Sequence, residues 1–215
     1  MTGRFITLEG PEGSGKSTQA RLLAELLRGL GETVVVTREP GGTAIGEQIR
    51  DVLLDQGNCA MLAQTEALLL TAARAQHVGE VIRPALSTGA VVVCDRFLDS
   101  TLAYQGGGHG LPMDQLLAIQ ELATNGLRPD LRLLFDLPVD VGLARRLQAK
   151  DGVNRIDRAA TEFHERVRAA FLELARAEPD GWVIIDASKA IVDVANQVRD
   201  AVTNRLQLPV IDETP

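Results

Sequence analysis

The 215-residue sequence lacks most of the side chains that mark a nucleic-acid surface or a disulfide-stabilised fold. Aromatic residues make up 3% of it and the net charge is −7, so a basic, ring-stacking surface for nucleic acid is not expected. Hydrophobic residues make up 45%, but no run of them is long enough to cross a bilayer, so no membrane span is expected. The two cysteines, Cys59 and Cys94, lack metal-ligand or redox spacing and are expected to be free thiols.

The first residues show neither the basic region nor the cleavage site of a secretion signal, which predicts a cytoplasmic location. No internal repeat, low-complexity tract or linker divides the chain, and its length suits one domain over residues 1–215. Since the chain is acidic as a whole, any polyanionic ligand must meet local clusters of basic side chains.

Short apolar runs alternate with helical patterns along the chain. The runs predict strands at 5–9, 33–37, 90–95, 131–137 and 182–186. Helices are expected near 17–30, 43–55, 61–87, 112–125, 139–149, 157–177 and 189–205, and the GGGHG stretch at 106–110 predicts a flexible loop. Because the strands are apolar throughout and alternate with helices, we predict an α/β fold: a five-stranded parallel sheet with helices on both faces. Ligands bind such sheets beyond the carboxyl ends of the strands.

A glycine-rich stretch, GPEGSGKST, joins the first strand to the first helix with the spacing Gly-x-x-x-x-Gly-Lys-Ser. Such a loop turns backbone N–H groups onto phosphate oxygens, while Lys16 reaches the β- and γ-phosphates and Ser17 ligates Mg²⁺. A chance glycine-rich turn is the alternative. The predicted ATP-binding residues are Gly10, Pro11, Glu12, Gly13, Ser14, Gly15, Lys16, Ser17 and Thr18. Glu12 is unusual here because a carboxylate repels phosphate unless it turns away.

Charged residues follow two other predicted strands. Asp95 closes the third strand in the manner of an acidic Mg²⁺ ligand, although it could instead cap the next helix. Arg96 beside it presents a planar fork suited to an oxyanion. Arg38 follows the second strand and Arg50 lies one helix later; alone, Arg50 could be a solvated charge. Together the arginines indicate a second phosphate site facing the glycine-rich loop, as phosphoryl transfer between nucleotides requires.

Several motifs jointly resemble the bacterial thymidylate kinase family over nearly the whole chain. They are GPEGSGKST, TREPGGT, EALLLTAARAQ, DRFLDSTLAYQG and RPDLRLLFDLP, in that order. The resemblance implies the three-layer P-loop NTPase fold of a nucleoside monophosphate kinase and transfer of the ATP γ-phosphoryl group to dTMP, giving dTDP and ADP. It also implies a requirement for Mg²⁺, held by Ser17 and Asp95, and a homodimer.

The resemblance assigns the dTMP-binding residues by position. Arg38, Arg50 and Arg96 are expected to meet the dTMP phosphate, and Arg74 the thymine ring. Ser100 and Thr101 are expected to border the base, while Tyr104 and Gln105 form the wall beneath the sugar. Leu70 stands where the family usually has a stacking phenylalanine. The alternatives are that Ser100 and Thr101 cap a helix and that Tyr104 is a half-buried core aromatic.

A cation-rich segment at about 144–157 resembles the family's lid. Its candidates are Arg145, Arg146, Lys150 and Arg155, of which Arg155 is preferred, while Arg145 and Arg146 could simply stabilise a helix end. Here the family's usual Asp-Arg-x-Glu reads Asn-Arg-Ile-Asp. The predicted catalytic residues are Lys16, Arg96, Arg155 and Glu12, with Glu12 orienting dTMP through its 3′-hydroxyl instead of acting as a base.

Other classes of function remain open at this point. The chain could be a kinase of another nucleotide or nucleoside, or a nucleotide-binding module without turnover, as Leu70 and the altered lid would allow. A P-loop switch protein is a further alternative, but the sequence has no Asn-Lys-x-Asp motif for guanine.

Overall fold

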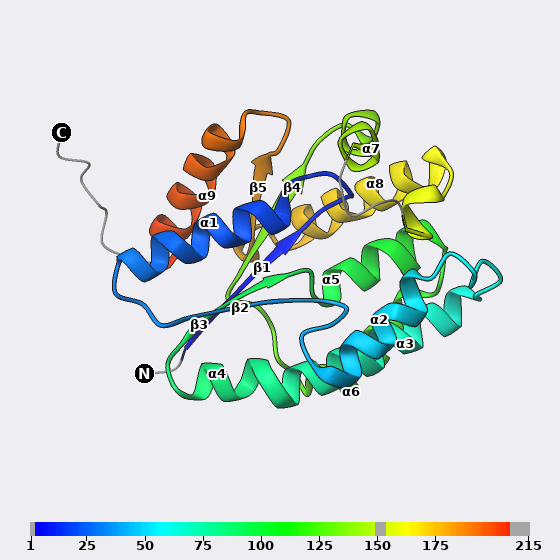
Figure 1. The fold of residues 1–215 in the computed structure, drawn as a ribbon, viewed down its shortest axis with the longest axis horizontal. Coiled ribbons are helices and arrows are strands. Elements are labelled where there is room, and N and C mark those ends of the chain that lie inside the picture. The colour runs from blue at the N-terminus through cyan, green and yellow to red at the C-terminus, as the bar shows by residue number, and fades with distance from the viewer. Residues whose placement is uncertain (1–2, 149–153, 207–215) are drawn as a thin grey trace.

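A five-stranded, all-parallel sheet forms the centre of the computed structural model, which describes residues 3–148 and 154–206 (Figure 1). Its strand order is β2-β3-β1-β4-β5. The strands are β1 Arg4–Glu9, β2 Val34–Arg38, β3 Val91–Asp95, β4 Leu131–Asp136 and β5 Trp182–Asp186. The predicted fold class and parallel sheet are therefore confirmed, with each strand within one residue of its predicted bounds.

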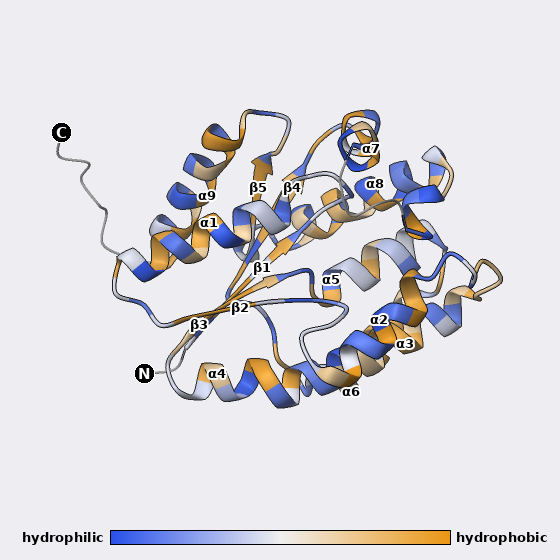
Figure 2. Ribbon diagram, viewed as in Figure 1, coloured by the Kyte–Doolittle hydropathy of each residue, from blue (hydrophilic) through white to orange (hydrophobic). Residues whose placement is uncertain are grey.

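The central strands are covered on both faces, because almost all of their residues are buried, and in Figure 2 their ribbons are mostly in the hydrophobic colour. Their register sets the site, because Asp95 lies level with Leu8 of β1 and with Arg38 of β2. Two hydrogen bonds tie the strand ends together: Arg96 N donates to Leu8 O at 2.9 Å, and Glu39 N donates to Asp95 O at 2.9 Å. The chemistry-bearing residues that follow β1, β2 and β3 thus meet at one edge of the sheet.

Helices α1 Lys16–Gly29 and α9 Ile191–Leu206 pack side by side on one face of the sheet (Figure 1). Their buried leucines and valines join the alternate side chains of the strands in one hydrophobic cluster, which includes Leu23, Leu27 and Val198. Helix α1 is therefore fixed against the sheet, and so is its N-terminal end, which follows the glycine-rich loop.

The opposite face of the sheet carries a longer set of helical segments, two of which are π-helices. The segments on this face are α3 Ala63–His77, the π-helix Val78–Ile82, α4 Arg83–Ser87, α5 Leu98–Thr101, the π-helix Leu102–Gly108, α6 Met113–Thr124 and α8 Thr161–Ala177. Helix α2 Ala44–Leu54 packs against α3, and α7 Val139–Leu147 packs against α8. Short 3-10 turns, Ile156–Arg158 and Pro179–Gly181, precede α8 and β5. Sheet and helices make three layers.

The prediction of a flexible loop at 106–110 was wrong for its first half. Helical backbone continues through Gly108, and the glycines there allow close packing against α8. A Cβ atom on Gly107 would lie 2.4 Å from Ala170 Cβ, and one on Gly108 would lie 2.5 Å from Phe163 Cε2. No helix among residues 3–148 and 154–206 is both long and apolar enough to cross a membrane.

Candidate active site

A cavity of about 590 Å³ opens at the carboxyl edge of the sheet. It brings together most of the residues predicted from the sequence. Those lining it are Glu12, Gly13, Ser14, Gly15, Lys16, Ser17, Thr18, Arg38, Arg50, Leu70, Arg74, Asp95, Arg96, Ser100, Thr101, Tyr104, Gln105, Arg145 and Arg146. Gly10, Pro11 and Arg155 are not among the lining residues, and Lys150 lies outside the described residues.

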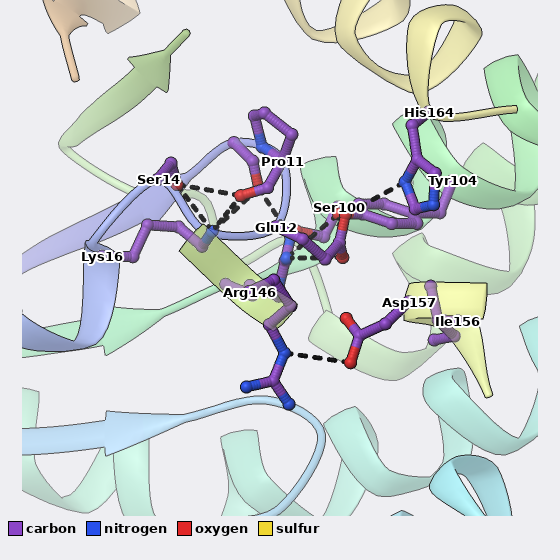
Figure 3. Close-up of polar contacts among 12 residues, drawn as sticks. Pro11, Glu12, Ser14, Lys16, Ser100, Tyr104, Arg146, Ile156, Asp157 and His164 are labelled. Carbon is purple, nitrogen blue, oxygen red and sulfur yellow. Dashed lines mark hydrogen bonds and ion pairs between the residues drawn. The ribbon is translucent and has the colours of Figure 1, made fainter. Parts of the chain in front are cut away.

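The glycine-rich loop takes backbone conformations that need glycine. Gly13 has φ +67° and Gly15 has φ +84°, and a Cβ atom on Gly13 would lie 2.0 Å from Gly142 O. Lys16 folds back into the loop, where its Nζ donates to Gly10 O at 3.0 Å, Pro11 O at 2.7 Å and Ser14 Oγ at 2.9 Å (Figure 3). Burial and the charge of Arg96 lower the pKa of Lys16 to about 8, against the opposing effect of nearby carboxylates. The loop thus concentrates N–H donors and one ammonium group at the start of α1.

Ser17 and Asp95 form the corner predicted to hold a metal ion. The Ser17 hydroxyl donates to Asp95 Oδ2 at 2.5 Å, so the two oxygens already point at one another beside the loop. Mg²⁺ prefers oxygen ligands and is usually held by one or two carboxylates together with substrate phosphates. A hydroxyl and a carboxylate next to a phosphate loop fit that preference.

Arg96 holds the two ends of the cavity together from a strained backbone position. Its φ is +72°, in the left-handed region, and its Nη1 donates to Gly10 O at 2.9 Å. Its Nη2 donates to Glu12 Oε1 at 3.1 Å and to Tyr104 Oη at 3.0 Å. One guanidinium therefore contacts both the phosphate loop and the π-helix that carries Tyr104. These contacts hold Arg96 in its strained backbone conformation.

Glu12 turns its carboxylate away from the loop and toward that wall. Oε1 accepts from Arg96 and, at 2.5 Å, from the Tyr104 hydroxyl. Oε2 lies 3.4 Å from Nδ1 of His164, a residue that the sequence analysis missed. Burial alone would raise the pKa of Glu12, but the contact with His164 and the charges of Arg96 and Lys16 outweigh it and lower the pKa to about 2. Glu12 is therefore anionic at neutral pH.

A buried carboxyl group, that of Glu9, supports the segment that carries Arg96. Glu9 Oε1 accepts from the backbone N–H of Phe97 at 2.8 Å, and Oε2 accepts from the Ser100 hydroxyl at 2.6 Å. Burial, with the charge of Asp99, raises the pKa of Glu9 to about 8. The sequence analysis did not select Glu9, because it reads simply as the last residue of a strand.

Arg38 and Arg50 line the cavity from β2 and α2. Arg38 Nη2 contacts the Glu47 carboxylate at 2.9 Å in an exposed pair, and Arg50 Nη1 donates to Pro40 O at 2.9 Å. Both reach the same cavity as Arg96, as the sequence predicts. Arg38 is thus held by α2, and Arg50 by the turn that precedes that helix.

Arg74 is set in a buried polar network at the far end of the cavity. Its side chain is 2% exposed, and Nε donates to Glu39 Oε2 at 2.7 Å. Nη1 donates to Thr101 Oγ1 at 3.0 Å and to the Gln120 amide, and Nη2 donates to Phe97 O at 3.0 Å. The sequence analysis missed Glu39 and Gln120, which fix the guanidinium plane. Thr101, which the family resemblance places beside the base, thus contacts Arg74, which the same resemblance places at the thymine ring.

The lid cations lie in two different places. Arg145 donates to Ala187 O at 2.7 Å, and Arg146 Nε donates to Asp157 Oδ2 at 2.9 Å beside the phosphate loop (Figure 3). Arg155, the preferred candidate, pairs instead with the Glu66 carboxylate and donates to Leu53 O at 3.2 Å. Glu66 also accepts from the Gln105 amide at 2.6 Å. Glu66 thus links Arg155 to Gln105, which lines the cavity.

A glycine-rich phosphate loop facing arginines across one cavity, on a parallel sheet, defines a P-loop phosphotransferase with a small phosphorylated acceptor. A sequence model of the family "Thymidylate kinase" matches residues 8–198. The chain belongs to the thymidylate kinase family, as its motifs indicated, and members of that family transfer the γ-phosphoryl group of ATP to dTMP.

Known proteins agree with this assignment. The chain is 53% identical to the thymidylate kinase of Pseudomonas fluorescens over 97% of its own length and 99% of that protein. It is 52% identical to the thymidylate kinase of Pseudomonas syringae pv. syringae over 90% of its length and 92% of that protein. The crystal structure of thymidylate kinase from Ehrlichia chaffeensis superposes with a TM-score of 0.76 at 32% identity, covering 94% of this chain and 99% of that one.

Proposed function

We propose that the cavity holds ATP at the glycine-rich loop and dTMP at the arginine-lined end, with Arg96 between them. The observation that carries this proposal is the set of contacts made by Arg96, which bonds to Gly10 and Glu12 of the loop and to Tyr104 of the opposite wall. A guanidinium in that position neutralises charge on the acceptor phosphate and holds it near the donor.

The donor half consists of the loop, Lys16 and the Ser17 and Asp95 pair. Lys16 leaves its contacts with the loop carbonyls to bind the β- and γ-phosphates, and Ser17 and Asp95 hold Mg²⁺. When bound, Mg²⁺ offsets charge on the transferring phosphoryl group. Arg145 and Arg146 line the same cavity and add positive charge from α7. The catalytic role predicted for Arg155 stays a prediction and requires that Arg155 exchange Glu66 for the substrate.

The acceptor half positions dTMP. Arg38, Arg50 and Arg96 bind its phosphate, while Arg74 and Thr101 face the base from their shared hydrogen bond, with Ser100, Gln105 and Leu70 around them. Tyr104 closes the space beneath the sugar. Glu12 accepts from the sugar 3′-hydroxyl and orients dTMP; no general base is needed, because the attacking phosphate oxygen is already ionised.

A substrate panel tests this assignment. We expect dTMP to be phosphorylated faster than dUMP, dCMP, GMP or thymidine in a coupled ADP-release assay, and Lys16→Ala to abolish transfer. A clear preference for another acceptor would overturn the acceptor half. Turnover no greater than in buffer at saturating ATP, Mg²⁺ and dTMP would instead support a binding module.

The homodimer implied by the family resemblance is also part of this proposal. Exposed apolar side chains gather on α2, α3 and α6, which are neighbours in the helical layer (Figure 1): Ile45 is 51% exposed, Leu68 58% and Leu122 84%. Burial of such side chains stabilises association. Light scattering on wild type and Leu68→Glu tests it, with a monomeric wild type as the contrary result. The cytoplasmic location stays a prediction.

A further inference from the structure

His164 lies on α8 with its ring inside the protein, where 1% of its side chain is exposed. Its neighbours on the same helix face, Phe163, Val167 and Phe171, are buried apolar residues. Neither ring nitrogen has a hydrogen-bond partner that meets strict geometry among the described residues. A buried imidazole is costly to leave unpaired, so its nearest polar neighbour is informative.

That neighbour is Glu12 of the phosphate loop. Glu12 Oε2 is itself buried without a hydrogen bond of good geometry within the described parts of the chain, and it lies 3.4 Å from His164 Nδ1 (Figure 3). Two buried polar atoms without other partners thus face each other. A movement of a few tenths of an ångström brings them into the usual range of an N–H···O hydrogen bond, about 2.7–3.2 Å.

We propose that His164 is a positioning residue that fixes the Glu12 carboxylate by donating Nδ1–H to Oε2, and so pre-orients Glu12 for the dTMP sugar. This inference rests on the proposed role of Glu12 in binding dTMP. Glu12 is then held by three donors from separate segments: Arg96 after β3, Tyr104 of the π-helix and His164 of α8. Both oxygens are engaged, so the carboxylate cannot rotate freely about its last bond.

The charges around Glu12 show why a third donor matters. Lys16 lies close enough to lower the Glu12 pKa, and the loop around it is built for phosphate. Without His164, Oε2 would be free to turn toward the ammonium group of Lys16. That ammonium group is needed to bind the phosphates of ATP. His164 draws Oε2 in the opposite direction, toward α8, and so keeps the acceptor-facing carboxylate apart from the donor site.

Two substitutions of His164 separate positioning from packing. His164→Phe keeps an aromatic ring of similar size and removes the donor, whereas His164→Asn keeps an N–H donor at nearly the distance of Nδ1 from the backbone. We expect His164→Phe to raise KM for dTMP about tenfold, as loss of one hydrogen bond to a charged group implies. KM for ATP should change by less than about twofold. His164→Asn should recover most of the dTMP affinity.

A purely packing role predicts a different pattern. If His164→Phe behaved as wild type, or if both variants raised KM for dTMP and ATP alike, the proposal would be overturned. A double-mutant cycle with Glu12→Gln adds a second criterion: His164→Phe should have no further effect on KM for dTMP when Glu12 is already Gln. Additive effects would mean that His164 does not act through Glu12.

The tautomer of His164 gives a readout that needs neither turnover nor a stable variant. Selective ¹⁵N NMR on the wild-type protein, which has 3 histidines, should show a protonated Nδ1 for His164. A bare Nδ1 would contradict the proposal outright. If Glu12→Gln alone left KM for dTMP unchanged while Nδ1 was protonated, the pairing would stand and the proposed role of Glu12 would fail.

Discussion

Ser17 and Asp95, 78 positions apart in the sequence, are joined by a hydrogen bond of 2.5 Å between the Ser17 hydroxyl and Asp95 Oδ2. The contact exists because β3 lies next to β1, so that Asp95 at the end of β3 lies beside the first turn of α1, which the glycine-rich loop joins to β1. Their meeting brings a hydroxyl and a carboxylate together beside the phosphate loop, and both supply the oxygen atoms that Mg²⁺ prefers.

Removing the charge of Asp95 should weaken the binding of Mg²⁺ more than the binding of ATP. We expect Asp95→Asn to raise the Mg²⁺ concentration that gives half-maximal turnover by more than about tenfold, because it removes a carboxylate ligand. The measurement is a Mg²⁺ titration of the initial rate at saturating ATP and dTMP. The matched control is Asp51→Asn, an exposed aspartate of α2. An unchanged titration curve for Asp95→Asn would place the ion elsewhere.

Arg96 should not tolerate lysine. The guanidinium makes separate hydrogen bonds to Gly10, Glu12 and Tyr104, and a lysine ammonium lacks the planar fork needed to make them together. We expect Arg96→Lys to lower kcat/KM for dTMP about 100-fold, corresponding to about 2.7 kcal/mol. Initial rates over a range of dTMP concentrations measure it, with Arg21→Lys on the exposed surface of α1 as the control. A decrease below threefold would contradict the central place given to Arg96.

Sequence patterns predicted the sheet and the phosphate-binding part of the cavity for a physical reason, whereas the residues around the base came from the family resemblance. The strands follow from buried apolar runs, and parallel strands bring their carboxyl ends to one edge, so residues just after a strand converge there. Lys16, Asp95 and Arg96 belong to this group. They can be recognised from the sequence alone, because each belongs to the segment at or just after the end of a strand.

Residues fixed by packing between distant helices were not predictable in this way. His164 reads as one member of the buried stripe of α8, and its only signal is a histidine at an apolar position of that stripe. Glu66 captures Arg155 from 89 positions away. The GGGHG stretch resembles a loop in composition, yet two of its glycines, Gly107 and Gly108, are required by the close approach of α8. Each outcome depends on which helices meet, which local composition does not encode.

The Gly107 contact makes a prediction about stability. Gly107→Ala would place a Cβ atom 2.4 Å from Ala170 Cβ, so we expect it to lower the free energy of unfolding by about 1–3 kcal/mol. Gly29→Ala is the matched control, because no atom lies within 4 Å of its added Cβ at the end of α1. That control should be neutral or slightly stabilising. Urea unfolding distinguishes them, and an equally stable Gly107→Ala protein would disprove the close packing.

Glu9 should make stability depend on pH. Its pKa is about 8 in the folded protein and near the ordinary value of 4.5 when unfolded, so between those values the folded state holds a proton that the unfolded state has lost. The free energy of unfolding therefore falls as pH rises from about 4.5 to 8, by up to about 1.4 kcal/mol per pH unit.

Glu9→Gln cannot titrate, so its urea-unfolding free energy should fall less steeply across that window than that of wild type. Glu25→Gln, at an exposed position of α1, should keep the wild-type slope. Identical slopes in wild type and Glu9→Gln would show that the buried carboxyl does not hold its proton.

Leu70 offers a gain of affinity. It lines the cavity from α3, one helical turn before Arg74, at the position where the family resemblance places a stacking phenylalanine. An aromatic ring against the thymine face contributes about 0.5–1.5 kcal/mol beyond the apolar area that leucine already covers. We therefore expect Leu70→Phe to lower KM for dTMP by about two- to tenfold and to leave KM for ATP unchanged. Leu70→Met, which is similar in volume and not aromatic, is the control. If Leu70→Met improved dTMP binding as much as Leu70→Phe, the gain would come from side-chain adaptability, and ring stacking on thymine would not be its cause.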